Sequence, residues 1–113
     1  MTHHLRLHPE PFALIKSGRK CIESRLYDEK RQAFQIGDIL IFISRKDSDE
    51  IKTIITNIYH HPTFIELFSK QPLEKFGNKS QHELLEEIES FYSKAEQEKY
   101  GVVGIEFKII NNI

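Results

Sequence analysis

The chain has 113 residues, 39% of them hydrophobic and 29% charged, which is typical of one soluble globular domain. Its 16 Lys and Arg residues against 17 Asp and Glu residues give a net charge of −1, which excludes nucleic-acid binding through overall positive charge and leaves only a local patch. The single cysteine, Cys21, excludes an intrachain disulfide and favours a cytoplasmic protein, and no apolar run reaches the roughly 20 residues of a membrane helix.

The first residues predict a strand followed by a short helix. Residues 3–8 alternate between leucines, which we expect in a core, and His or Arg side chains, which we expect in water. Pro9 and Pro11 suit the first turn of a helix. Gly18 ends that helix, because glycine adopts the left-handed conformation at a helix C-terminus without strain.

The second predicted strand, residues 20–26, carries a charged pattern. Lys20 stands at its start, so the charged side chains of Lys20, Glu23 and Arg25 converge where the helix ends and the strand begins. They form either a binding site or an ion pair on a solvated strand, which contributes little stability. Alternation divides the strand into two faces, with Ile22, Ser24 and Leu26 toward a core and Cys21, Glu23 and Arg25 away from it.

The middle of the chain predicts a loop and a hairpin. Residues 27–35 have mixed charge and no period, which predicts a surface loop, and Gly37-Asp38 is a turn signal. The apolar run 39–43 predicts a strand buried on both sides or in a barrel wall. A polar turn joins it to a return strand over residues 51–59, which is rich in Ile and Thr.

Two helices and a last strand complete the predicted order. Thr63 and Glu66 form a capping box that opens a brief helix, and residues 70–79 predict a loop. Ser80 and Glu83 form a second box, which opens one longer helix. The apolar residues of that helix are Leu84, Leu85, Ile88, Phe91, Tyr92 and Ala95; in the last strand Val103, Ile105, Phe107 and Ile109 share one face, opposite Glu106 and Lys108. Helices segregated from a mostly antiparallel sheet indicate an α+β fold.

Several kinds of site find no support in the sequence. The six histidines are dispersed, and no Cys or His pair has metal-ligand spacing, so we predict neither a metal nor a cofactor. Cys21 has no histidine at a spacing that would make it a nucleophile. There is no glycine-rich phosphate loop. Candidate chemistry is therefore confined to Lys20, Glu23 and Arg25.

These three side chains suit a ligand that carries both hydrogen-bond donors and an anion. Arg25 can fork onto a phosphate or carboxylate, and Lys20 supplies a mobile charge or, if desolvated, a base. Glu23 can accept from the exocyclic amine of a nucleobase. A nucleotide meets all of these requirements. Tyr27 and Tyr100 are candidates for stacking on a base, although either can equally lie in the core or at a rim.

The motif Gly18-Arg19-Lys20-Cys21-Ile22-Glu23-Ser24-Arg25, followed by Gly37-Asp38 and an apolar strand, resembles the ASCH domain family of the PUA-like superfamily. The closing Tyr100-Gly101-Val102-Val103-Gly104 resembles the family's last strand. The resemblance covers nearly the whole chain and implies one domain, residues 1–113. It also implies a partly open β-barrel of about five strands flanked by helices, with a cleft that binds RNA or a modified nucleoside.

Some ASCH-like proteins are amidohydrolases that deacetylate acetylated cytidine, and they are similar to this chain at Lys20 and Arg25. Where they carry a threonine nucleophile, this chain has Glu23, which could instead activate a water. Their supporting glutamate matches either Glu74 or Glu83. The resemblance also leaves open a ribonuclease and a regulatory interaction module, and the oligomeric state is not predicted.

Overall fold

The computed structural model describes residues 1–110, which form five strands, five α-helices and one 3₁₀ turn. In chain order these are β1 (Thr2–Leu7), α1 (Pro9–Lys16), β2 (Ile22–Leu26), α2 (Glu29–Gln32), β3 (Ile39–Ser44), β4 (Glu50–His61), α3 (Phe64–Lys70), the 3₁₀ turn η1 (Leu73–Lys75), α4 (Gln81–Glu89), α5 (Lys94–Tyr100) and β5 (Val102–Ile109). The predicted α+β class and the five strands are confirmed.

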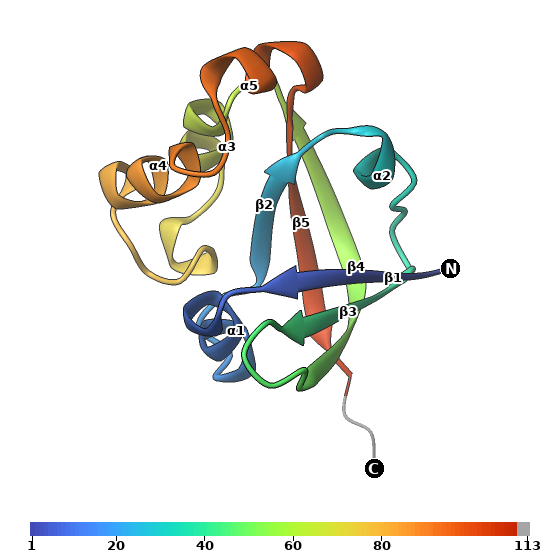
Figure 1. The fold of residues 1–113 in the computed structure, drawn as a ribbon. Coiled ribbons are helices and arrows are strands. Elements are labelled where there is room, and N and C mark those ends of the chain that lie inside the picture. The colour runs from blue at the N-terminus through green and yellow to red at the C-terminus, as the bar shows by residue number, and fades with distance from the viewer. Residues whose placement is uncertain (111–113) are drawn as a thin grey trace.

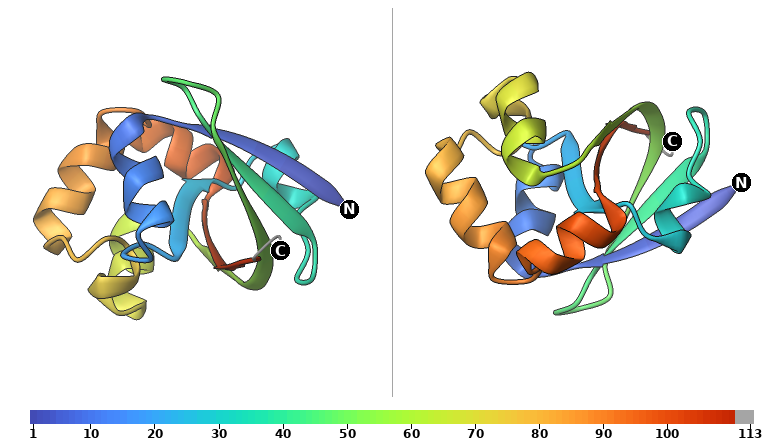
Figure 2. Two further views of the ribbon diagram at one scale, coloured as in Figure 1. Left: turned by 90° about the horizontal axis from the view of Figure 1, so that it is seen from below. Right: turned by 90° about the horizontal axis from the view of Figure 1, so that it is seen from above.

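The five strands form one curled sheet in the order β1-β3-β4-β5-β2 (Figures 1 and 2). β1 pairs with β3 in parallel, and the other neighbours are antiparallel. β1 and β2 are therefore the two edges of a half-barrel that is not closed by strand pairing. A register shift between Ile55 and Asn57 interrupts the long strand β4, as bulges do where a sheet bends. Across the open side, Arg25 Nη2 donates to the backbone oxygen of Arg6 at 3.1 Å.

Two hydrophobic clusters lie on opposite sides of β2 and β5. The interior cluster fills the curl of the sheet under α1, and the outer cluster lies between β2, β5 and the helices α3 and α4. The interior cluster includes Leu5, Leu7, Phe12, Ile15, Leu40, Phe42, Ile55, Val103, Ile105 and Phe107. The outer cluster includes Ile22, Leu26, Phe64, Leu67, Phe68, Phe76, Leu84 and Val102.

Helix α3 approaches β5 closely at Gly104. A Cβ at this position would lie 2.8 Å from a methyl group of Leu67, so only glycine lets the helix pack this near to the strand. On the β2 side, Ile22 and Leu26 enter the outer cluster, as predicted, but the prediction of Cys21 on the opposite face was wrong, because Cys21 precedes the strand and packs against the same cluster. The strand β2 is thus anchored on one face, and its other face is available for Glu23 and Arg25.

The prediction of a surface loop over residues 27–35 was wrong in two respects. Residues 29–32 form α2, because the Asp28 side chain accepts from the backbone amide of Arg31 and caps the turn. Phe34 is buried in the interior cluster. The predicted loop 70–79 likewise contains the turn η1 and a buried Phe76.

The single long helix predicted after Ser80 was also wrong. α4 ends at Glu89, and α5 begins under a separate capping box formed by Ser93 and Glu96. The apolar spacing runs on through the break, so Phe91 and Tyr92 lie in the link between the two helices. Within residues 1–110 no helix has both the length and the apolar character needed to cross a membrane.

Candidate functional site

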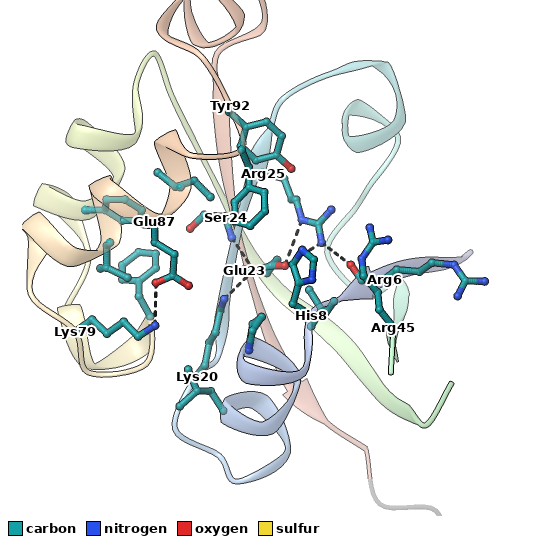
Figure 3. A pocket seen from close by; sticks show the side chains of 18 residues that line it. Arg6, His8, Lys20, Glu23, Ser24, Arg25, Arg45, Lys79, Glu87 and Tyr92 are labelled. Atoms are coloured by element: carbon teal, nitrogen blue, oxygen red, sulfur yellow. Dashed lines mark hydrogen bonds and ion pairs between the residues drawn. The ribbon is translucent and has the colours of Figure 1, made fainter. Parts of the chain in front are cut away.

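Lys20, Glu23 and Arg25 form a largely buried charged cluster at the start of β2 (Figure 3). Lys20 Nζ lies 2.9 Å from Glu23 Oε1, and Arg25 Nη2 lies 3.1 Å from Glu23 Oε2. The Glu23 side chain is only 7% exposed, and its two partners are each 14% exposed. The cluster is therefore not an ion pair on a solvated strand.

Local structure explains why these residues meet. Gly18 adopts a φ of 80° after α1, and the Lys20 amide then donates back to Leu14 at the end of that helix. Lys20 also forms an isolated antiparallel bridge with Phe76, which fixes it ahead of β2. Glu23 and Arg25 follow two residues apart on one face of the strand, so the carboxylate lies between the two cations.

The charges of its neighbours keep Glu23 ionised. Burial alone would raise the pKa of Glu23, but the charges and hydrogen bonds of Lys20 and Arg25 outweigh burial and lower this pKa to about 2. Burial would lower the pKa of Arg25, whereas Glu23 and the adjacent Tyr92 hydroxyl raise it. At neutral pH the cluster therefore contains an ionised carboxylate held between the Lys20 and Arg25 side chains.

The hydrogen bonds of Glu23 leave little acceptor capacity for a ligand. Its Oε2 accepts from both Nε and Nη2 of Arg25, at 3.2 and 3.1 Å. Its Oε1 faces Lys20 and accepts from the backbone amide of Ser24 at 3.3 Å. A carboxylate has about four lone-pair sites, so Glu23 organises the cluster, whereas the ammonium of Lys20 has further donors to offer.

The free edge of β2 adds backbone groups to the site. Phe107 donates to the Cys21 carbonyl and Tyr27 donates to the Gly101 carbonyl, so odd-numbered residues of this segment bond to β5. The backbone groups of Ser24 then face the unpaired edge. Its side chain belongs to the face of Ile22, as predicted, yet Ser24 lines the pocket because the pocket extends around that edge.

A pocket surrounds this cluster between the edges β1 and β2, helix α1 and helix α4 (Figure 3). Five cationic side chains and two carboxylates line it, although the whole chain has a net charge of −1. Sequence reasoning missed most of these residues, because they come from separate elements and carry no local motif. The cations are Arg6, Lys20, Arg25, Arg45 and Lys79, the carboxylates are Glu23 and Glu87, and the apolar walls include Leu14, Phe68, Phe76, Leu84, Ile88, Phe91 and Tyr92.

Two aromatic rings meet beside the charged cluster. His8, just after β1, stacks on Phe91 from the link between α4 and α5, with ring centroids 5.5 Å apart and an interplanar angle of 24°. Phe91 is 56% exposed, which is unusual for a large apolar side chain. Both rings line the pocket and present apolar surface to whatever enters it.

The structure does not bring the predicted tyrosines into this pocket. Tyr27 packs on the ring of His60, with centroids 4.1 Å apart, and Tyr100 packs on the outer cluster. Glu74 and Glu83 are also outside it, and the Glu83 carboxylate caps the backbone of Ser80. Glu87 is the later glutamate that reaches the pocket, where it accepts from Lys79 at 2.8 Å.

A second charged cluster lies around Glu106, on the strand β5 that pairs with β2. Glu106 of β5 accepts from the Tyr59 hydroxyl and from Lys75 Nζ, the latter at 3.0 Å. Burial would raise the pKa of Glu106, but these two donors lower it. Burial and the Glu106 charge raise the pKa of the nearby Cys21 thiol. None of these four residues lines the pocket. Across residues 1–110, no three His, Cys, Asp or Glu side chains are grouped to hold a metal ion.

Comparison with known proteins gives a consistent result. A family model described as the ASCH domain matches residues 5–111. The fold is similar to the crystal structure of the hypothetical protein PH0355, with 38% identity, a TM-score of 0.86, and coverage of 97% of this chain and 100% of that one. It is also similar to the NMR structure of protein PF0455 from Pyrococcus furiosus, with 34% identity, a TM-score of 0.77, and coverage of 99% and 100%.

A more distant structure shows the same fold. The crystal structure of ASCH from Zymomonas mobilis is 14% identical, with a TM-score of 0.65, and the match covers 95% of this chain and 66% of that one. No curated protein matches the chain.

Proposed function

Because the chain belongs to the ASCH domain family, we propose that its charged pocket binds a nucleotide-like ligand or a short stretch of single-stranded RNA. One observation carries this proposal: five cations and two carboxylates share a pocket with aromatic walls, in a chain whose net charge is negative. A local positive patch beside aromatic rings suits a ligand with both phosphate and bases.

The parts of the pocket have separate roles in this proposal. Lys20 offers donors to an acceptor on the ligand, and its position is fixed by Glu23. The exposed ring of Phe91 offers a stacking surface for a base. The Ser24 carbonyl, on the unpaired edge of β2, offers an acceptor to the polar rim of that base. Glu23 holds Lys20 and Arg25 in place, and its role is not direct contact with the ligand.

A titration with a matched control tests the proposal. Fluorescence anisotropy of labelled RNA pentamers is measured at two salt concentrations for wild type, Lys20→Ala and Lys75→Ala. Lys75 is the control, because it also pairs with a glutamate but lies outside the pocket. We expect Lys20→Ala to weaken binding about tenfold at both salt concentrations, because a hydrogen bond to the polar part of the ligand is lost, and Lys75→Ala to leave the affinity unchanged. Equal affinities of wild type and Lys20→Ala would remove this pocket as the site.

Hydrolysis of acetylated cytidine is the second candidate, favoured by one observation: Ser24, which carries a hydroxyl, and Lys20 line the same pocket. Glu23 is a poor base here, because its two cationic partners hold it ionised with a low pKa. Incubation with N4-acetylcytidine, followed by chromatography, separates the candidates. Release of cytidine that is lost in both Ser24→Ala and Lys20→Ala would establish the enzyme, and no release above buffer would exclude it.

A further inference from the structure

Within the proposed function, we infer that the ligand is a phosphorylated nucleoside whose phosphate binds Arg6 and Arg45 at the mouth of the pocket. The inference rests on the proposed nucleotide-like ligand and adds where its phosphate lies. It follows from which of the five cations already have partners.

The inner cations are largely neutralised within the protein. Arg25 donates to Glu23 through Nε and Nη2, and to the Arg6 carbonyl through Nη2. Lys20 pairs with the same glutamate. Lys79 pairs with both Glu10 and Glu87, at 2.6 and 2.8 Å. A dianion at the inner wall would have to displace these carboxylates, so the inner wall suits the neutral, polar part of a ligand.

Arg6 and Arg45 differ from the inner cations. Both line the pocket and are exposed, and no carboxylate of residues 1–110 lies within ion-pair distance of either guanidinium. Two guanidinium groups without carboxylate partners in one pocket can bind phosphate oxygens, because each offers a planar fork of donors.

The strand register holds the two arginines together. Arg6 pairs with Ile43 and Leu7 with Ser44 in the parallel ladder of β1 and β3, so the next position in register is His8 beside Arg45. The Arg45 amide donates to the Leu7 carbonyl at 2.9 Å, which fixes that position. His8 directly follows β1, two residues after Arg6, so the backbones of Arg6 and Arg45 both flank His8.

The same residue connects the arginines to the stacking surface. His8 stacks on the exposed Phe91, and the two arginines line the same pocket as the ring on which a base would rest. A phosphate on the arginines and a base against Phe91 or the Ser24 edge place both halves of a nucleotide at adjacent parts of one opening. A free nucleoside would leave the arginines unused.

Calorimetric titration of paired ligands tests this assignment. Each of cytidine, uridine, adenosine and guanosine is compared with its 5′- and 3′-monophosphate, and inorganic phosphate is titrated alone. The proteins are wild type, the double variant Arg6→Gln/Arg45→Gln, and Arg19→Gln. Arg19 is the control, since it is exposed and lies outside the pocket.

We expect a monophosphate to bind at least about tenfold more tightly than its nucleoside to wild type and Arg19→Gln, as one or more charge-assisted hydrogen bonds predict. The double variant should bind both forms with the nucleoside's affinity. Equal binding of nucleoside and monophosphate to wild type, or a preference that survives in the double variant, overturns the inference and leaves the proposed function standing. Inorganic phosphate that binds as tightly as any monophosphate also overturns it. If neither these ligands nor RNA binds wild type, both proposals fail.

Discussion

Glu23 and Glu106 stand on adjacent strands of the same sheet, and each accepts hydrogen bonds from two neighbouring side chains. In the ladder, Glu23 is the partner of Ile105 and Glu106 is the partner of Ile22. The two carboxylates are thus offset by one position, and they belong to opposite faces. Both have lowered pKa values.

Their surroundings differ. Glu23 is 7% exposed and has two cationic partners that are almost as buried, whereas Lys75, the cation beside Glu106, is 38% exposed. Unpaired cations and aromatic rings line the space around Glu23, whereas Glu106 does not line this pocket. A carboxylate with two donors is therefore not a site by itself. The pocket and its surplus of positive charge distinguish the first cluster from the second.

The largest expected effect is on stability. Glu23→Gln removes the anion between two buried cations, and breaking a buried pair in this way costs about 3–5 kcal/mol of unfolding free energy. Glu106→Gln should cost below about 1 kcal/mol, because Lys75 is solvated. Urea denaturation of both variants measures the difference. Losses of equal size would mean that the two clusters do not differ in burial as the structure indicates.

The second-largest difference between the two clusters should appear in how the unfolding free energy depends on pH. The folded-state pKa of Glu23 is about 2, below the value of 4.5 for an unperturbed glutamate, so its contribution is complete above pH 4.5 and is lost as pH falls toward 2. The full contribution is on the order of 3 kcal/mol. Denaturation at pH 6, 4 and 3 should show this loss in wild type and in Glu106→Gln, and a much flatter profile in Glu23→Gln. A wild-type profile that is flat over this range would contradict the lowered pKa.

Ligand affinity should depend only on residues that line the pocket around Glu23. Phe91→Ala should weaken RNA binding by about 2 kcal/mol, or roughly thirtyfold, if the exposed ring stacks on a base. Ile65→Ala removes another exposed apolar side chain outside the pocket, and it should leave affinity unchanged. Anisotropy titrations with RNA compare the affinities of the two variants with that of wild type. Unaltered binding in Phe91→Ala would assign the exposed ring another role.

The sequence predicted the cluster on β2 because Lys20, Glu23 and Arg25 are close along the chain, and strand alternation fixes their shared face. It could not predict Lys79, Glu87 or Tyr92 as neighbours, because they come from α4 and the segments beside it, which only the tertiary fold brings to the pocket. Local spacing predicts contacts within an element, whereas the other walls of a pocket depend on topology.

The errors in the fold have a similar origin. Apolar spacing from Leu84 to Ala95 indicated one helix, but the capping box of Ser93 and Glu96 starts a new one. Within α5 the buried residue is Gln97, whose amide oxygen accepts from the Phe64 backbone. A buried polar side chain that ties α5 to α3 gives no hydrophobic signal. The half-open barrel was predicted only from the family resemblance, whereas the residue pattern alone predicted no more than an α+β fold.

The smallest expected effect concerns the cluster around Glu106, through the thiol that it borders. Burial first, and the Glu106 charge second, raise the pKa of Cys21, whereas the Lys75 charge lowers it. Glu106→Gln should therefore increase the thiolate fraction and speed alkylation by iodoacetamide at pH 8 severalfold.

Lys75→Ala should slow the same reaction, so the two variants should change the alkylation rate of Cys21 in opposite directions. Mass spectrometry follows the reaction of Cys21, the only cysteine. Glu66→Gln, on the exposed surface of α3, is the matched control and should not change the rate. If both variants shift the rate in the same direction, the change reflects loosening of the local structure, and the charges at Glu106 and Lys75 do not set the reactivity of Cys21.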